Sequence, residues 1–270
     1  MLKNPIKNPI VKDVASKFQA CYDITKVFAN ETGNAAIKGL LISGDAGTGK
    51  THWVWGAINA ANADDRTVDI KAGSITAAAL FCELYNAREK GNIIVLDDCD
   101  IINREKKERI AFIDLLKGAT DTTKGKRMLT WSTAAKNPLM KEYNVPAKFD
   151  FQGSIIWITN ELMSDMENKL KAHWAAINSR FNVIPISLTT EQKLMYTAHL
   201  IEIEDMLGSN CYAKEGGYSK RIQADTLEFL YDEYKNLTEI SPRYAIKIAD
   251  TICQHPSSWK TILKNQMTGQ

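Results

Sequence analysis

Eight consecutive residues match the pattern G-x-x-x-x-G-K-[ST], a loop that binds the phosphates of a nucleotide. They are Gly44, Asp45, Ala46, Gly47, Thr48, Gly49, Lys50 and Thr51. The glycines let successive backbone N–H groups face an anion, and the helix that follows adds its positive N-terminal end. Lys50 would bring its charge to the β- and γ-phosphates, and the Thr51 hydroxyl would bind Mg²⁺. This P-loop motif predicts a site for ATP and Mg²⁺.

Two neighbouring aspartates follow the most strongly apolar run of the chain. Asp97 and Asp98 come directly after residues 93–96, which are all aliphatic. We expect a parallel strand adjacent to the P-loop strand, which would deliver both acids to its carboxyl end beside the phosphates. Asp97 would hold Mg²⁺, directly or through water, and Asp98 would polarise the attacking water. A strand that merely ends in a polar turn is the alternative interpretation.

Both motifs follow short apolar runs that alternate with longer helical patterns, which is typical of an α/β fold with a parallel sheet. Five runs have the character of strands: 39–43, 68–71, 92–96, 154–159 and 183–186. Pro185 in the last run favours an edge position or a strand end. Helical patterns of the same region cover residues 52–61, 75–90, 106–117 and 163–177.

Beyond Leu188 the strand signal stops and four helical patterns follow. They cover residues 190–207, 224–237, 241–253 and 259–267. The third begins with Ser241 and Pro242, which are a side-chain cap and a proline at the first helical position. The sequence therefore predicts three parts: a helical lead-in (1–35), an α/β nucleotide-binding core (36–188) and a small helical domain (189–270).

The order of these motifs resembles that of the AAA+ ATPases. After the P-loop and the aspartate pair come a strand that ends in Thr159-Asn160 and then the tetrapeptide Asn178-Ser179-Arg180-Phe181. The resemblance extends from about Ala36 to Trp259. It implies a P-loop NTPase core with a parallel sheet, an all-helical lid domain after it, and hydrolysis of ATP to ADP and phosphate.

The same resemblance implies roles for three further residues. Asn160 would be sensor 1, which orients the lytic water near the γ-phosphate. Arg180 would be the finger that reaches a neighbouring subunit's nucleotide, and Arg243 would be sensor 2 in the lid. Because a finger arginine acts only between subunits, the chain would form a homo-oligomeric ring, a hexamer by the family's pattern. Taken alone, the residues leave plainer roles open: a turn for Asn160, a helix-end cap for Arg180, and a solvated first turn for Arg243.

The acid pair departs from the usual AAA+ pattern. AAA+ members usually carry Asp-Glu where this chain has Asp97-Asp98. Because the second acid is shorter here, two alternatives remain: slow hydrolysis, or an acid displaced by one methylene group. The pair and the Ile-Thr-Asn strand end are also similar to superfamily 3 viral helicases. A closer resemblance is to small AAA ATPases encoded by tailed phages, which implies a location in the host cytoplasm. It is carried by residues 96–100, 116–119, 149–153 and Trp259.

A basic segment, residues 124–148, lies between the expected helix (106–117) and the expected strand (154–159). Its basic residues are Lys124, Lys126, Arg127, Lys136, Lys141 and Lys148. Glu142 is its one acid, and Trp131 and Tyr143 are interleaved. Residues 128–131 have the pattern of a short strand, so we expect a hairpin. Its basic and aromatic residues would contact a nucleic-acid backbone and stack on a base, and a solvated charged loop is the alternative.

Composition excludes several classes of protein. With 34 Lys and Arg against 32 Asp and Glu, the net charge of +2 makes no overall case for nucleic acid. Five scattered cysteines without a CxxC pair and four dispersed histidines predict neither a disulfide framework nor a zinc site. No apolar run approaches the ~18–20 residues of a membrane span, and no signal-peptide pattern opens the chain. We therefore expect a cytoplasmic protein without a membrane partner.

Three functions fit these observations. The first is a ring motor that hydrolyses ATP to act on nucleic acid or a nucleoprotein complex, as a helicase or translocase does. The second is an ATP-gated loader or remodelling switch that acts on a protein partner such as a replicative helicase. A protein unfoldase is the third, and it is disfavoured because residues 73–77 lack the aromatic–hydrophobic–glycine loop usual in that class.

Overall fold

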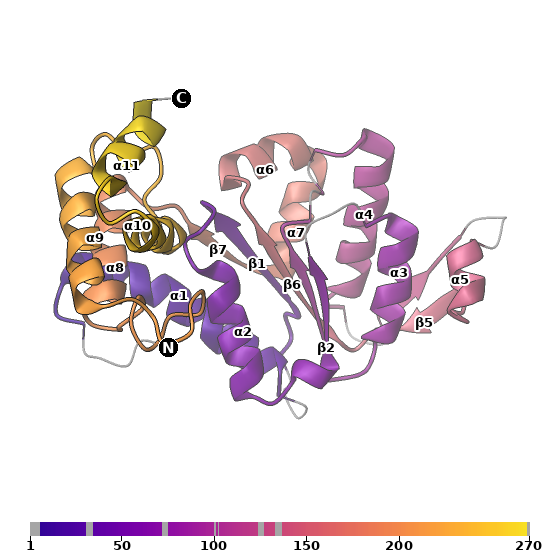
Figure 1. Cartoon of the computed structure of the whole chain (residues 1–270). Helices are drawn as coiled ribbons and strands as arrows, with labels where there is room; N and C mark the ends of the chain where they lie inside the picture. The colour runs from indigo at the N-terminus through magenta and orange to yellow at the C-terminus, as the bar shows by residue number, and fades with distance from the viewer. Residues whose placement is uncertain are drawn as a thin grey trace. The chain divides into compact units, whose positions relative to one another are not determined.

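A computed structural model describes residues 6–30, 35–71, 75–99, 101, 103–123, 127–132 and 137–268 (Figure 1). Several residues named above lie outside these ranges: Gly73, Ser74, Asp100, Lys124, Lys126 and Lys136. By its internal contacts the chain divides into two compact units. The helical unit comprises Met1–Phe18, Asp45–Gly49 and Leu188–Gln270, and the sheet unit comprises Gln19–Gly44 and Lys50–Ser187.

The sheet unit is built on five parallel strands in the order β2-β3-β6-β1-β7. Their bounds are Gly39–Gly44 (β1), Thr67–Lys71 (β2), Ile93–Asp97 (β3), Ser154–Thr159 (β6) and Phe181–Ile186 (β7). The α/β class predicted from sequence is confirmed, and so is the edge position of the strand that contains Pro185. The expectation that the acid-bearing strand lies next to the P-loop strand is wrong, because β6 lies between β1 and β3.

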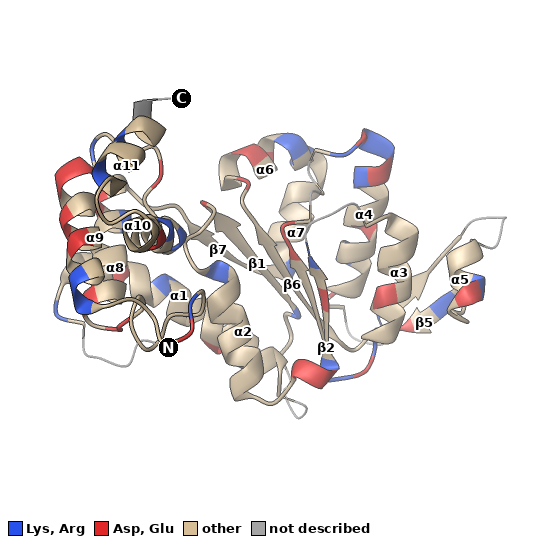
Figure 2. Ribbon diagram, viewed as in Figure 1, with Lys and Arg blue, Asp and Glu red and all other residues tan. Residues whose placement is uncertain are grey.

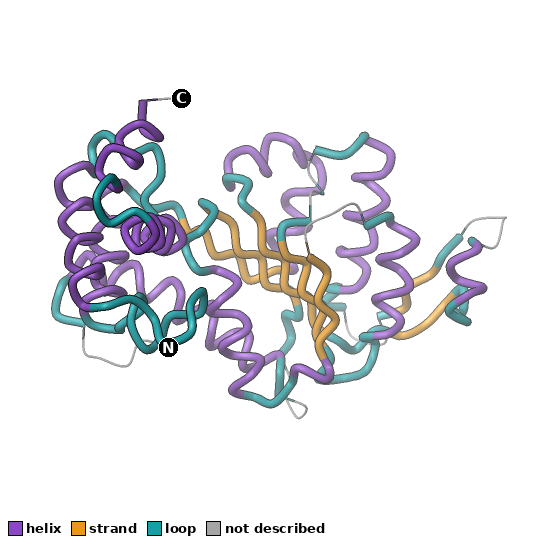
Figure 3. The backbone as a smooth tube through the Cα atoms, in the orientation of Figure 1, coloured by secondary structure: helices purple, strands orange, loops and turns teal. Residues whose placement is uncertain are grey.

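The central strands are apolar throughout because both faces of the sheet are covered. Every residue of β1 and β6 is buried, and Figure 3 shows helices on both sides of the strands. The core includes Leu41, Phe81, Phe112 and Trp157, all fully buried. The helices of this unit are α2 (Lys50–Ala60), α3 (Ala77–Asn86), α4 (Lys106–Ala119), α5 (Pro138–Glu142), α6 (Met163–Leu170) and α7 (Trp174–Arg180), with short 3₁₀ turns at Asp64–Arg66 and Lys171–His173.

One helical prediction needs correction. The pattern over residues 163–177 predicts a single helix, whereas α6 ends at Leu170 and α7 begins at Trp174. Lys171 has a positive φ of 28°, which no helix interior accommodates. The backbone therefore turns at this lysine, and a 3₁₀ turn joins the two helices.

The basic segment forms the expected antiparallel strand pair. Strand β4 (Met128–Thr130) pairs with β5 (Lys148–Asp150), and α5 stands between them in the chain. Trp131 packs on Phe81 with their ring centroids 5.4 Å apart, so this tryptophan belongs to the core and is not available to stack on a base. The exposed aromatic is Tyr143, at 56%. Figure 2 shows both signs of charge along α5 and β5.

The helical unit contains α8 (Thr190–Glu202), α9 (Lys220–Glu233), α10 (Pro242–Gln254) and α11 (Trp259–Thr268), together with the first half of α1 (Pro9–Phe28). Leu230, Ile248 and Leu263 lie in its core. The predicted cap is present, since the Ser241 hydroxyl accepts a hydrogen bond from Tyr244 N at 3.0 Å. Among the described residues, no helix has the length and apolarity needed to cross a bilayer.

Replacing Trp131 by alanine should destabilise the protein in the absence of any nucleic acid. Loss of its packing on Phe81 is expected to cost about 2–3 kcal/mol, somewhat less than for a fully buried tryptophan. Tyr143→Ala is the matched control, because this exposed aromatic of the same segment should leave the free energy of unfolding nearly unchanged. Denaturant titration of both variants measures the difference, and equal stabilities would show that Trp131 does not contribute to the core.

Candidate functional site

The P-loop begins where β1 leaves the sheet. Gly44 has a φ of +145°, and a Cβ atom placed on it would stand 2.1 Å from the carbonyl oxygen of Ile186 in the neighbouring strand β7. Only glycine fits this position, because any side chain would push β7 away. Helix α2 starts at Lys50, so the predicted order of strand, glycine turn and helix is present.

Lys50 starts a row of hydrogen bonds along the carboxyl edge of the sheet. Its ammonium group donates to the Gly44 carbonyl and to Asn160 Oδ1, both at 2.8 Å, and the residue is only 5% exposed. The amide nitrogen of Asn160 donates in turn to Asp98 Oδ1 at 2.7 Å. The structure therefore brings together the P-loop lysine, the polar end of β6 and the second acid after β3.

Thr51 and Asp97 form a second pair at the same edge. The threonine hydroxyl donates to the two carboxylate oxygens at 3.1 and 3.0 Å. Burial raises the pKa of the Asp97 carboxyl, and the charges of Asp98 and Asp69 act in the same direction, while the hydrogen bond from Thr51 and the charge of Lys50 oppose them. A half-buried carboxylate beside a hydroxyl is a suitable partial ligand set for Mg²⁺, which takes its remaining ligands from phosphate and water.

Asp98 lies in an unusual backbone conformation. Its φ is +53°, in the left-handed region that costs an L-residue roughly 1–2 kcal/mol. The Asp98 N–H donates to Ile158 O of β6 at 3.1 Å, which holds the turn in place. Because the chain turns here, the carboxylate faces Asn160. Such strain is typical of functional positions.

A cavity of about 360 Å³ opens beside Asp98 and Asn160, between the loops that follow β3 and β6. Three polar residues that line it were not predicted from sequence: Asn103, Glu161 and Asp165. Asn103 donates to Glu161 Oε1 at 2.8 Å and accepts from Lys169 Nζ at 2.6 Å, which ties the two loops to α6. No motif marks these residues, and only the position of Glu161 directly after Asn160 could have suggested one of them.

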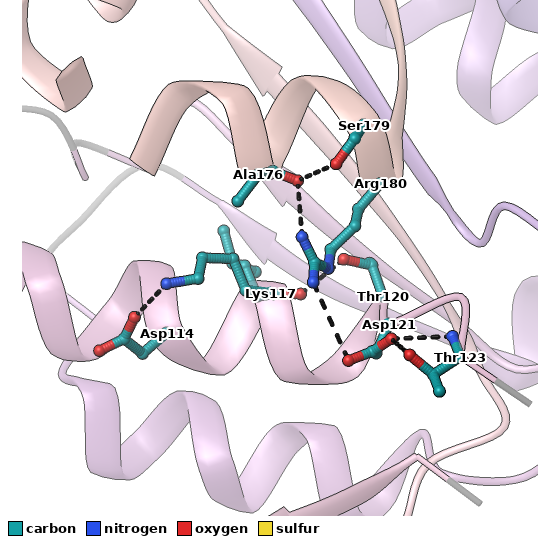
Figure 4. Close-up of polar contacts among 9 residues, drawn as sticks. Asp114, Lys117, Thr120, Asp121, Thr123, Ala176, Ser179 and Arg180 are labelled. Carbon is teal, nitrogen blue, oxygen red and sulfur yellow. Dashed lines mark hydrogen bonds and ion pairs between the residues drawn. The ribbon is translucent and has the colours of Figure 1, made fainter. Parts of the chain in front are cut away.

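Arg180 lies at the opposite edge of the sheet from these groups. It immediately precedes β7, whose first residue pairs with the first residue of β1. A six-residue strand separates it from the carboxyl edge by about 17 Å. Figure 4 shows its guanidinium between Ala176 O, at 3.2 Å, and Asp121, an ion pair at 4.0 Å. Among the described residues no acceptor reaches its buried Nε atom.

The inner P-loop residues, Asp45–Gly49, belong by their contacts to the helical unit. Gly47 has a φ of +73°, and a Cβ atom on it would stand 2.8 Å from Ser241 Oγ. Arg243 is exposed in the first turn of α10, two residues beyond this serine. The sensor 2 candidate therefore lies on the helix end that packs against the loop.

Comparison with known proteins found one curated relative and several solved structures. The relative is a 36.7 kDa protein of phage T4 from the nrdC–mobD intergenic region, described as uncharacterized; it is 28% identical over 256 residues, which cover 93% of this chain and 74% of that protein. The structures include the Holliday junction branch migration motor RuvB of Thermotoga maritima (13% identity, TM-score 0.48, covering 92% of this chain and 63% of that one). They also include NtrX of Brucella abortus in complex with ADP (13% identity, TM-score 0.44, covering 92% and 52%). The chain thus spans less than two thirds of both solved structures, and no family model matches it.

The arrangement within the two units decides the fold. In the sheet unit, the P-loop lysine, the acid pair and the Thr-Asn strand end meet at one edge of a parallel sheet. In the chain, an all-helical segment follows the last strand. The fold is an α/β fold in which the P-loop lies at the carboxyl edge of a five-stranded parallel sheet, and helices follow the sheet in the chain.

Lys50→Ala should abolish the binding or the turnover of ATP. The side chain is nearly buried and would be the one cation that the P-loop itself brings to the phosphates. Isothermal titration with ATP and Mg²⁺, together with an assay of phosphate release, tests this. Lys260→Ala, which removes an exposed lysine of the helical unit, is the matched control, and an active Lys50→Ala protein would show that this loop is not the site.

The two aspartates should give different phenotypes. Asp98→Asn should keep ATP affinity and lose about 10²–10⁴ in turnover, because a positioned general base contributes about this much. Asp97→Asn should also weaken the Mg²⁺-dependent part of ATP binding, because it removes the carboxylate that pairs with Thr51. Binding measured with and without Mg²⁺ separates the two roles, and identical behaviour of both variants would contradict the division.

Proposed function

We propose that this protein is an ATP-hydrolysing ring motor that acts on nucleic acid or a nucleoprotein complex, in the manner of a helicase or translocase. In this proposal residues 36–188 form the nucleotide-binding core, 189–270 the helical lid and 1–35 a lead-in. The row from Lys50 through Asn160 to Asp98 is the observation that carries the ATPase assignment. This connected row would supply a cation to bind phosphate, a polar group to orient water and a carboxylate to accept the proton of that water.

Each of these side chains has a distinct task in the proposed reaction. Lys50 exchanges its hydrogen bond with Asn160 for one with a phosphate oxygen. Asn160, held by Asp98, is then free to orient a water molecule, and Asp98 accepts the proton that this water loses as it attacks. Thr51 and Asp97 would hold Mg²⁺, which when bound neutralises charge on the β- and γ-phosphate oxygens.

The position of Arg180 supports assembly into a ring, and a hexamer is the proposed form. Because Arg180 lies about 17 Å from the carboxyl edge, it cannot act on a nucleotide bound at the P-loop of its own subunit. Arg180 would instead contact a nucleotide bound to a neighbouring subunit, as the role of a finger arginine requires. Its ion pair with Asp121 and its hydrogen bond to Ala176 hold the side chain at the surface that would meet this neighbour.

The β4–α5–β5 segment is the candidate surface for the polymer. Lys141, Lys148 and Tyr143 are exposed on the β4–α5–β5 segment and would contact nucleic acid. Glu142 and Asp150 make the described part of this segment mixed in charge, and the partly buried Trp131 packs against the core. These two observations favour the second candidate function, an ATP-gated loader or remodelling switch on a protein such as a replicative helicase. The relative in phage T4 supports the resemblance to phage ATPases and a location in the host cytoplasm.

The rate of ATP hydrolysis with single-stranded DNA, duplex DNA, RNA or unfolded protein tests the proposed function. The motor predicts a severalfold rise with one nucleic acid, which should be lost when Lys141 and Lys148 are both changed to alanine. Stimulation by a replication protein alone would favour the loader. Absence of turnover under every condition, with Lys50→Ala as the blank, would contradict both.

Mixing two inactive variants tests the ring. Arg180→Ala retains its P-loop and Lys50→Ala retains its arginine, so mixed assemblies should regain activity at some interfaces. Loss of a transition-state arginine costs about 10³–10⁵ in rate, so partial rescue would stand well above background. Asp121→Ala is the control, because it removes the ion pair and leaves the arginine. A protein that stays monomeric with ATP, with Arg180→Ala fully active, would rule out the interface mechanism.

A further inference from the structure

The P-loop, which would bind the anionic phosphates of a nucleotide, itself contains a negatively charged residue. Asp45 follows the first glycine of the motif and is the only negatively charged residue among the eight. An uncompensated carboxylate at this position would repel the phosphates of a nucleotide. The loop therefore needs a compensating cation other than Lys50, which binds Gly44 and Asn160 in this structure and would bind the phosphates in the proposed function.

The structure supplies this cation from the helical unit. Lys193 Nζ lies 2.8 Å from Asp45 Oδ2, and the two side chains are 25% and 35% exposed. An exposed ion pair contributes little, but this one is partly shielded from water and lies on the loop that would bind the ligand.

Both partners are held in place by their surroundings. Lys193 stands in the first turn of α8, which Thr189 and Gln192 fix by a reciprocal capping box. On the loop side, the Thr48 hydroxyl donates to Asp45 O at 3.0 Å. The ion pair therefore joins two segments whose backbones are preorganised.

A second acid makes the compensation more important. Glu239 Oε1 accepts a hydrogen bond from Ser241 Oγ at 2.7 Å and lies 3.3 Å from the position of a Cβ atom built on Gly47. Without Lys193, the loop would face the carboxylates of both Asp45 and Glu239.

We propose that Lys193 is a positioning residue for nucleotide binding, which acts by neutralising Asp45. The inference rests on the proposed function, because it concerns the affinity of the same P-loop for a nucleoside triphosphate. Lys193 lies outside every motif of the sequence, on α8, the first helix after the last strand of the sheet. It also makes the affinity for phosphate depend on α8 being docked against the loop.

A double-mutant cycle tests the proposal by titration with ATP and Mg²⁺. Lys193→Ala should weaken ATP binding about tenfold, which is within the range of coupling between contacting charges. Asp45→Asn should bind at least as well as the wild type. The double variant should return to within about twofold of Asp45→Asn, because neither charge is left unpaired. Lys220→Ala is the matched control, since its ion pair with Asp205 also measures 2.8 Å and lies in the same unit away from the loop.

A second readout separates this role from a structural one. The loss caused by Lys193→Ala should grow from AMP to ADP to ATP and shrink at high salt, whereas a distorted loop would weaken all three alike. If Lys193→Ala does not fold, Lys193→Gln removes the charge and keeps most of the stem.

Three outcomes would overturn the proposal. Unchanged ATP affinity in Lys193→Ala would do so, as would a double variant as weak as Lys193→Ala alone. In both cases a wild type that binds ATP and a Lys50→Ala that does not would leave the proposed function standing. A wild-type protein that binds no nucleotide would contradict both the proposed function and the role of Lys193.

Discussion

The hydrogen bond from Lys50 to Asn160 is the contact on which the candidate site depends. Parallel strands present their carboxyl ends at one edge, but β1 and β3 are two strand spacings apart, roughly 10 Å. Neither the P-loop lysine nor Asp98 spans this gap alone. Asn160 closes it because β6 lies between them, and its amide can accept from the lysine and donate to the acid at the same time.

The parallel direction of the strands also explains why the two edges of the sheet carry different chemistry. The carboxyl edge collects the groups that would meet phosphate, Mg²⁺ and water. The amino edge carries Arg180, which α7 and Asp121 fix in place. Arg180, the last residue of α7, therefore lies away from the carboxyl edge of its own subunit, which agrees with the proposal that it serves a neighbouring subunit.

Much of this could be predicted because the signals are local. The strands β1, β3 and β6 are uninterrupted apolar runs, the P-loop is a complete motif, and Ser241-Pro242 marks the start of α10. The order of the strands could not be predicted, because it is set by contacts between distant segments. The break at Lys171 also has no local signal, since neither glycine nor proline stands there.

Side-chain environments were the least predictable part. Trp131 lies in a basic, polar stretch, yet its ring packs on Phe81 of α3. Lys193 looks like any exposed helical lysine until α8 and the P-loop are seen together. In both residues the role depends on a partner far away in the sequence, and no periodicity or spacing encodes that partner.

A crystal structure with Mg²⁺ and a non-hydrolysable ATP analogue would show whether the phosphates bind at Lys50. A γ-phosphate oxygen should take the place of Asn160 Oδ1 on Lys50 Nζ. Mg²⁺ should lie about 2.1 Å from Thr51 Oγ1, with Asp97 beside it directly or through water. A nucleotide bound elsewhere, or one bound at the loop while Lys50 keeps its hydrogen bonds to Gly44 and Asn160, would contradict this assignment of the site.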